Sequence, residues 1–129
     1  MDQIFCQTLN TPLGKMFVEA SSYGLTKVGW GKSEHSEIDN IHTQKGVHWL
    51  NKYFDKTDAK MPIFDTRNLT IFQKFVLLKL KTSEFGSIIS YGQLASKANS
   101  PRASRAVGSV MAMNPWPIIV PCHRVVRSD

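Results

Sequence analysis

The hydrophobic pattern of this 129-residue chain predicts an α/β fold made of two small domains. Short runs with alternating apolar residues fill the first half, whereas apolar residues recur at helical spacing in the second half. We therefore expect an N-terminal domain over residues 1–66, built from a small antiparallel sheet and a helix. A mainly helical domain with a helix-turn-helix is expected over residues 67–129.

Three short runs in the N-terminal half predict the strands of an antiparallel meander. They are DQIFCQTL (2–9), GKMFVEA (14–20) and LTKVGWG (25–31), and the turn-forming stretches NTPLG and SSYG separate them. A helix is expected over residues 41–56, where the apolar side chains at helical spacing are Val47, Leu50, Tyr53 and Phe54. The polar, turn-rich stretch DKTDAKMPIFDTRN is the predicted connection between the halves.

The first helix of the second half is predicted from about Thr70 to Lys81. Its apolar stripe consists of Leu69, Phe72, Phe75, Val76 and Leu80. Thr70 and Gln73 have the spacing of a capping box, in which each residue caps the backbone of the other. Ser90 and Gln93 repeat this spacing in the next helical stretch, FGSIISYGQLASKA.

Another helix is predicted between Ser100, a favourable N-cap, and Asn114, which precedes a proline. Its predicted buried stripe consists of Ala103, Ala106, Val107, Val110 and Met111. Together with the preceding helix it makes a helix-turn-helix candidate. Most of its side chains are small, which would let the backbone approach a nucleic-acid groove. Tight packing on a neighbouring helix would explain the same composition.

Charge is distributed unevenly along the chain. Residues 1–66 carry seven Lys or Arg against eight Asp or Glu, whereas residues 67–129 carry nine against two. A basic half favours a polyanionic partner, nucleic acid first, although a solvated basic surface without a partner explains it equally well. No apolar run approaches the roughly 20 residues that span a bilayer. The two cysteines, Cys6 and Cys122, favour a reducing compartment over a disulfide scaffold.

The stretch NPWPIIVPCHRVV, residues 114–126, is the candidate for chemistry. Ile118–Val120 is predicted to form a short buried strand between prolines. Cys122 follows, and the neighbouring His123 and Arg124 would lower the pKa of its thiol and favour the thiolate. A buried structural cysteine is the alternative. Because successive residues of a strand point to opposite faces, Cys122 and His123 meet only if the backbone turns between them.

From about Thr70 to Val126 the chain closely resembles the O6-alkylguanine-DNA alkyltransferases, also called methylated-DNA–protein-cysteine methyltransferases. The motifs ISYGQLA, SRAVGSVM and NPWPIIVPCHRVV carry this resemblance. It implies a DNA-binding domain with a winged helix-turn-helix. It also implies repair of double-stranded DNA by stoichiometric transfer of an alkyl group from O6-alkylguanine, or O4-alkylthymine, to a cysteine. The activity would be that of a methylated-DNA–[protein]-cysteine S-methyltransferase, used once and without a cofactor.

The resemblance also implies roles for individual residues. Cys122 would accept the alkyl group, and His123 would act as its base through a water. Asn114 would brace the turn that shapes the pocket, Tyr91 would contact the target guanine, and Arg105 would fill the gap left by the flipped nucleotide. The other expected base-pocket residues are Trp116, Pro117 and Val125. The other expected DNA-binding residues are Arg102, Ala103, Ser104, Ala106 and Gly108, with the small ones in the minor groove.

These residue types suit the implied chemistry. The O6 alkyl group is hidden in duplex DNA, so the base must leave the stack at a cost of about a few kcal/mol. An inserted arginine offers charge and a flat stacking surface in its place. A thiolate is an activated nucleophile for attack on the alkyl carbon, and the thioether that forms is stable.

The chain departs from the family after RVVRSD. Family members continue with a Gly-rich loop that covers the pocket and a helix whose Glu orients the histidine. We therefore expect a domain that is incomplete at its C-terminal end, binds DNA and transfers alkyl groups poorly. Some members hold zinc near the N-terminus, but Cys6 is the only cysteine of that half, so no metal is expected. We expect a monomer, cytoplasmic if bacterial and nuclear if eukaryotic.

Two other classes of function stay open. A non-catalytic alkyltransferase-like protein, or an inactive truncated member, would flip and sense the lesion without repairing it. The alkyltransferase-like proteins lack the acceptor cysteine, so the presence of Cys122 favours repair. An ordinary helix-turn-helix regulator is disfavoured, because the second helix lacks long polar side chains that read base edges.

Overall fold

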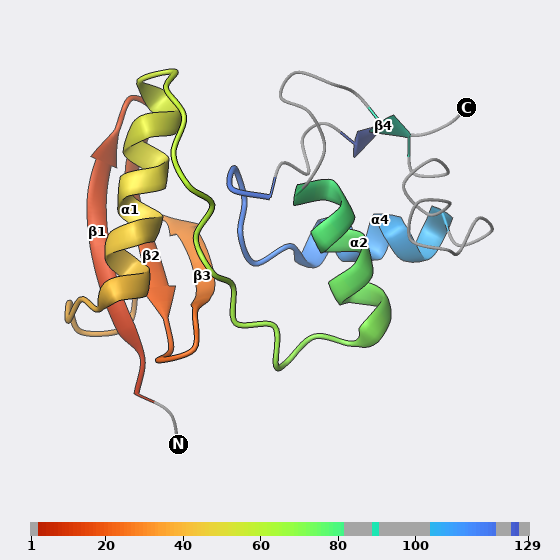
Figure 1. Ribbon diagram of the computed structural model, residues 1–129, viewed down its shortest axis with the longest axis horizontal. Helices are drawn as coiled ribbons and strands as arrows, with labels where there is room; N and C mark the ends of the chain where they lie inside the picture. Colours follow the sequence, from red (N-terminus) through yellow and green to blue (C-terminus); the bar gives the residue numbers. More distant parts are fainter. Residues whose placement is uncertain (1–2, 82–88, 91–103, 121–124, 127–129) are drawn as a thin grey trace. The chain divides into compact units, whose positions relative to one another are not determined.

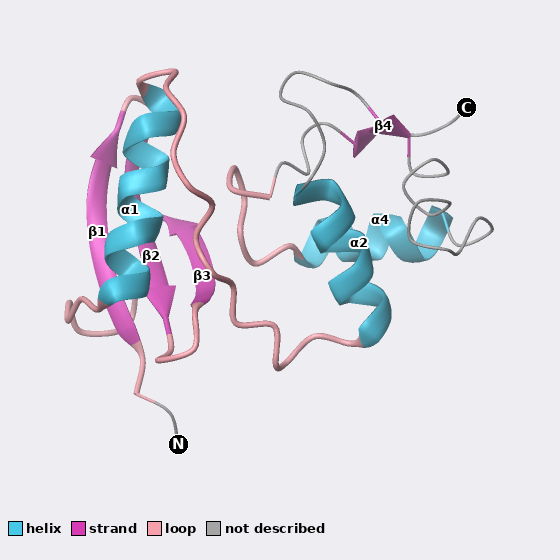
Figure 2. Cartoon of the chain, in the orientation of Figure 1, coloured by secondary structure: helices cyan, strands magenta, loops and turns pink. Residues whose placement is uncertain are grey.

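The computed structural model describes residues 3–81, 89–90, 104–120 and 125–126 (Figure 1). The chain divides into two compact units, Met1–Arg67 and Asn68–Asp129. The first unit combines a sheet with a helix, and the described part of the second is mainly helical (Figure 2). The predicted α/β architecture is therefore confirmed.

The first unit is a three-stranded antiparallel sheet with one helix across it. Strands β1 (Phe5–Thr11), β2 (Gly14–Ala20) and β3 (Leu25–Trp30) lie in the order β1-β2-β3. Helix α1 (Ile41–Phe54) contacts all three strands and crosses one face of the sheet (Figure 1). The predicted meander and its helix are confirmed. Because β2 is central, Met16, Val18 and Ala20 are completely buried.

Small residues allow α1 to approach the sheet closely. A Cβ atom built on Gly46 would lie 2.9 Å from Cγ1 of Val18 and 3.2 Å from both methyl carbons of Leu25, so a side chain there would force the layers apart. The buried residues of α1 are Thr43, Gly46 and Leu50. Of the four apolar residues at helical spacing, Leu50 is completely buried. The other three, Val47, Tyr53 and Phe54, are partly exposed.

The start of α1 is fixed by a capping box that the sequence reading did not identify. The side-chain oxygen of Asn40 accepts from the backbone N–H groups of His42 and Thr43, at 3.0 and 2.9 Å. In return, the Thr43 hydroxyl accepts from the Asn40 backbone N–H at 2.9 Å. Such a box satisfies donors that have no partner within the helix.

Each outer strand of the sheet is joined at one position to neighbouring chain by backbone–backbone hydrogen bonding. At β1 the Cys6 N–H donates to the Ile38 carbonyl at 2.8 Å. At β3 the Leu25 N–H donates to the Ile63 carbonyl at 2.8 Å, and the Leu25 carbonyl accepts from the Asp65 N–H at 2.9 Å. The stretch predicted as a mere connection therefore pairs with the sheet. At these positions the edge groups are no longer free to pair with another chain.

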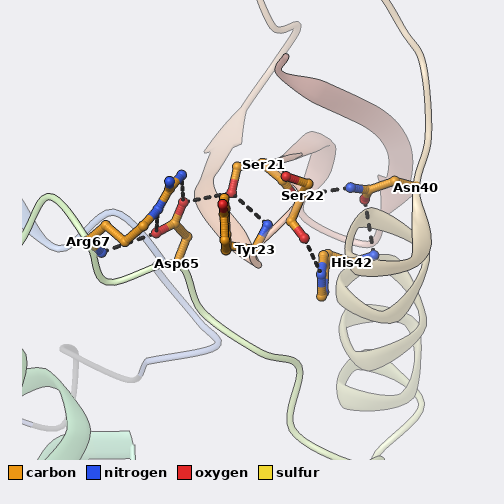
Figure 3. A network of polar contacts seen from close by, with 7 residues as sticks. All are labelled: Ser21, Ser22, Tyr23, Asn40, His42, Asp65 and Arg67. Carbon is orange, nitrogen blue, oxygen red and sulfur yellow. Dashed lines mark hydrogen bonds and ion pairs between the residues drawn. The ribbon is translucent and has the colours of Figure 1, made fainter. Parts of the chain in front are cut away.

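A polar network joins Asp65 and Arg67, at the end of the connecting stretch, to the turn before β3 (Figure 3). The buried Ser21 hydroxyl donates to Oδ2 of Asp65 at 2.6 Å, and its oxygen accepts from the Tyr23 N–H at 3.0 Å. Arg67 donates to both carboxylate oxygens of Asp65, at 2.9 and 2.8 Å, while its guanidinium lies 3.9 Å from the centre of the Tyr23 ring. These bonds, first of all those from Arg67, hold the pKa of Asp65 well below its usual range.

The second unit contains helix α2 (Ile71–Lys81) packed on helix α4 (Ser104–Met113). The predicted capping box of α2 is confirmed. The Thr70 N–H donates to Oε1 of Gln73 at 2.9 Å, and the Gln73 N–H donates to the Thr70 hydroxyl at 3.1 Å. The unit also holds a parallel pair of two-residue strands, β4 (Ile89–Ser90) and β5 (Val125–Val126). The rest of the predicted helix-turn-helix lies outside the described residues.

Two details of the predicted helix stripes are wrong. On α2 the buried pair is Val76 and Leu77, and Phe75 is 47% exposed. On α4 the residues Val107, Val110 and Met111 are buried as expected, but Ala106 is exposed. Periodicity predicts that a helix has an apolar face, but the partner helix determines which of the borderline residues it covers. No described helix is long and apolar enough to cross a membrane.

Candidate functional site

The residues expected to act on DNA belong to the second unit, in and around α4 and the chain that follows it. The structure describes the side chains of Ala106, Gly108, Asn114, Trp116 and Pro117. It describes the backbone of Ser104, Arg105 and Val125. The remaining predicted site residues, Tyr91, Arg102, Ala103, Cys122 and His123, lie outside the described residues.

Helix α4 presents two different faces. Its buried face carries Val107, Val110 and Met111 and packs toward α2. The exposed residues of α4 include the small Ala106, Ser109 and Ala112, and also Met113, which is 40% exposed near the end of the helix. Packing on α2 therefore does not explain why Ala106, Ser109 and Ala112 are small. Small exposed side chains let a helix backbone come close to a flat or grooved partner.

The chain after α4 forms a turn that the side chain of Asn114 holds at both ends. Oδ1 of Asn114 accepts from the Trp116 N–H at 2.9 Å, and its amide nitrogen donates to the Val120 carbonyl at 2.9 Å. Within the turn, the Val120 N–H donates to the Trp116 carbonyl at 2.9 Å. We call residues 114–120 the Asn114 turn. It leads directly into Pro121 and Cys122.

The predicted strand at Ile118–Val120 is wrong, although Ile119 and Val120 are buried as expected. Ile119 and Val120 are each 1% exposed, but the segment is a turn and Ile118 has φ of 73°. β-branched residues favour extended backbone, which is why the sequence predicts a strand. The bonds from Asn114 and the burial of Trp116, which is 2% exposed, outweigh that local preference.

The pairing of β4 with β5 is a feature that the sequence reading missed. Ile89 pairs with Val125, and Ser90 pairs with Val126, in parallel register. Tyr91 follows Ser90 directly, and Cys122 comes three residues before Val125. The pairing thus joins the two stretches of chain that carry the predicted base contact and the predicted acceptor. The only sequence signal was a pair of short β-branched runs, which is too weak to predict pairing at this separation.

The cysteine that the structure describes, Cys6, is poorly suited to act as a nucleophile. It lies on β1 and is 1% exposed. Burial, followed by the carboxylates of Glu19 and Glu37, raises the pKa of its thiol, although a hydrogen bond with Ser33 acts in the opposite direction. A thiol that is protonated and covered cannot attack an alkyl group on DNA. Within the described ranges, no three His, Cys, Asp or Glu side chains are grouped to hold a metal.

Comparison with known proteins gives consistent matches along the chain. Residues 71–129 match the family described as 6-O-methylguanine DNA methyltransferase, DNA binding domain. The human methylated-DNA–protein-cysteine methyltransferase is 36% identical, over 95% of this chain and 69% of its own length. The mouse protein of the same name is 45% identical, over 94% and 69%.

Solved structures agree with these matches. Mycobacterium tuberculosis O6-methylguanine methyltransferase has a TM-score of 0.81 at 29% identity, over 98% of this chain and 80% of that protein. The structure of Mycobacterium tuberculosis OGT in complex with DNA has a TM-score of 0.80 at 31% identity, over 96% and 79%.

Proposed function

Because the chain belongs to the methylated-DNA–protein-cysteine methyltransferase family, we propose that it repairs DNA by moving an alkyl group from O6-alkylguanine to one of its own cysteines. The observation that carries the proposal is the hydrogen-bonded Asn114 turn, which leads into PCHRV. A turn held by three hydrogen bonds gives the following residues a defined starting point. Family membership alone would not identify a part of this chain that can position an acceptor.

The acceptor in this proposal is Cys122. Cys6 is buried in the first unit and its pKa is raised, whereas Cys122 is followed by His123 and Arg124. Cationic neighbours favour the thiolate, which is the reactive form of cysteine. Of the two cysteines in the chain, only Cys122 therefore has neighbours that suit the chemistry.

The proposed transfer is a single displacement. His123, through a water, takes the proton from the Cys122 thiol. The thiolate sulfur attacks the alkyl carbon, the carbon–sulfur bond forms and the carbon–O6 bond breaks. The electron pair of the broken bond stays with the guanine, which takes up a proton and returns to its unmodified form. The protein keeps the alkyl group as a thioether, so each chain acts once and no cofactor takes part.

DNA is the partner that the second unit suits. The part of the chain from residue 67 onward carries nine Lys or Arg and two Asp or Glu, which favours binding to phosphates. The exposed residues of α4 include the small Ala106, Ser109 and Ala112, and Arg105 lies near the start of that helix. We assign Arg105 to the space left in the stack when the alkylated base leaves the duplex. One chain and one lesion suffice for this step, so the proposed active form is a monomer.

The intact mass of the chain tests the proposal directly. After incubation with duplex DNA containing O6-methylguanine, we expect the mass to rise by one methyl group and the lesion to disappear from the DNA in equal amount. Duplex with unmodified guanine is the control. A chain that binds the lesion duplex but keeps its mass would be a non-catalytic lesion binder, and the proposal would be wrong.

A further inference from the structure

The backbone of Ile118 adopts a conformation that its side chain disfavours. Its φ of 73° lies in the left-handed region. The other described residues with positive φ are Gly14, Gly24, Gly31 and Lys56, so Ile118 is the β-branched one among them. A β-branched residue in this region is a genuine outlier, because its branched Cβ crowds the backbone. The position after a turn proline, which Pro117 provides, normally suits Gly or Asn when φ is positive.

The Asn114 turn holds Ile118 in this conformation from both sides. The two bonds of Asn114 reach the Trp116 N–H before Ile118 and the Val120 carbonyl after it. The Trp116 carbonyl and the Val120 N–H are joined to each other across it. Buried side chains at Trp116, Ile119 and Val120 fix the flanks. A strained residue persists only where its surroundings determine its conformation more strongly than its own preference does.

We propose that Ile118 is a positioning residue for alkyl transfer: its disfavoured backbone makes the Asn114 turn, and the chain entering Cys122, depend on the Asn114 side chain. A glycine at this position would form the turn by itself. With isoleucine the local preference is extended, so the turn exists only while Asn114 holds it. The part of this inference that concerns transfer rests on the proposed function. The part that concerns the turn does not.

Four variants test this dependence. Asn114→Ala removes the two side-chain bonds, and Ile118→Gly, Ile118→Asn and Ile118→Val are then each added to it. Two quantities are measured on every chain: hydrogen exchange of the Val120 amide by NMR, and the single-turnover rate of methyl transfer at saturating lesion DNA. DNA affinity, measured by fluorescence anisotropy, reports whether each variant remains folded and able to bind.

Strain of this kind shifts a conformational equilibrium on the order of tenfold or more. Asn114→Ala should therefore lower both the protection of the Val120 amide and the transfer rate by about tenfold or more. Ile118→Gly should restore most of both, and Ile118→Asn should do so as well, because glycine and asparagine tolerate the left-handed region. Ile118→Val should restore neither, since valine is also β-branched. DNA affinity should be the same in all variants.

Several results would overturn the inference. Equal rescue by Gly and Val would show that side-chain size, and not backbone preference, is responsible. No rescue by either Gly or Asn, or no loss in Asn114→Ala, would show that the turn does not depend on this balance. Loss of DNA affinity together with the rate would mean that the turn supports the fold in general. If the unaltered chain transfers no methyl group, the proposed function fails, and the exchange of the Val120 amide still decides the claim about the turn.

Discussion

Both units of the chain contain a turn with a proline in it, and the two turns differ in which residue takes the positive φ. In the β1–β2 hairpin, Pro12 and Leu13 connect the strands, and the positive φ of 117° falls on Gly14. In the Asn114 turn, Pro117 is followed directly by Ile118 with φ of 73°. The first turn agrees with the preference of its own residues. The second opposes that preference, and conflicts of this kind are concentrated at functional sites.

The two cysteines show the same contrast. Cys6 is part of a paired strand, 1% exposed, and burial raises the pKa of its thiol. Cys122 follows the strained turn and precedes His123 and Arg124. Cys6 of the first unit is therefore part of a packed sheet. In our proposal, Cys122 of the second unit is instead positioned as a reactive thiolate.

The largest expected effect is on the cysteines themselves. Cys122→Ala should abolish methyl acceptance, because it removes the nucleophile. DNA binding should stay largely intact, because no positive charge is lost. Cys6→Ala is the matched control and should leave both properties unchanged. The gain of mass and the DNA affinity of both variants are the measurements. Methyl acceptance that survives in Cys122→Ala would remove the contrast between the two cysteines.

Arg105→Ala should separate base extrusion from binding. Extrusion of the target base should fall by roughly tenfold, because nothing then fills the gap in the stack. Overall affinity should fall much less, since it depends on several phosphate contacts and weakens with added salt. Fluorescence of a 2-aminopurine placed beside the lesion reports extrusion. Lys74→Ala, which removes another cation of the same unit, should leave that signal unchanged, and an equal response in both variants would contradict the role of Arg105.

Asp65→Asn should destabilise the first unit, by about 1–2 kcal/mol at neutral pH, because it weakens bonds to the buried Ser21 and to the half-exposed Arg67. The folded-state pKa of Asp65 lies below its unfolded value of about 3.9. The contribution of the Asp65 carboxylate to the free energy of unfolding is therefore fully present above the unfolded pKa. It is lost as the pH falls through the folded pKa. Urea denaturation at pH 7 and pH 3 measures this, with the exposed Asp58→Asn as control. An equal loss of stability in Asp65→Asn at both pH values would contradict the role of the Asp65 carboxylate in this network.

The smallest expected effect is on the cap of α2. Thr70→Ala should lower the free energy of unfolding of the second unit by about 1 kcal/mol, because the Gln73 N–H loses its acceptor. Thr70→Ser keeps a hydroxyl and should lose much less. Thermal unfolding followed by circular dichroism measures both. Methyl transfer should be unchanged in either variant, since the cap lies far along the chain from the Asn114 turn.

These contrasts also explain which parts of the molecule could be predicted from sequence. The strands of the first unit and the α2 cap were predictable, because neighbouring residues determine them: alternation, turn residues and the Thr70–Gln73 spacing. Residues 118–120 of the Asn114 turn were predicted as a strand, because the extended preference of Ile118 is overruled by a side chain four residues earlier. The β4–β5 pair was missed, because Ile89 and Val125 meet only after the chain between them has folded. Likewise, burial of Leu77 instead of Phe75 depends on the position of α4.

Peptide mapping of the alkylated chain tests the central claim most directly. The chain is incubated with excess duplex DNA whose O6-methylguanine carries an isotopically labelled methyl group, then digested and analysed by mass spectrometry. Our account predicts one labelled methyl on the peptide that contains Cys122 and none on the peptide that contains Cys6. Label on Cys6, or label divided between the two cysteines, would contradict it.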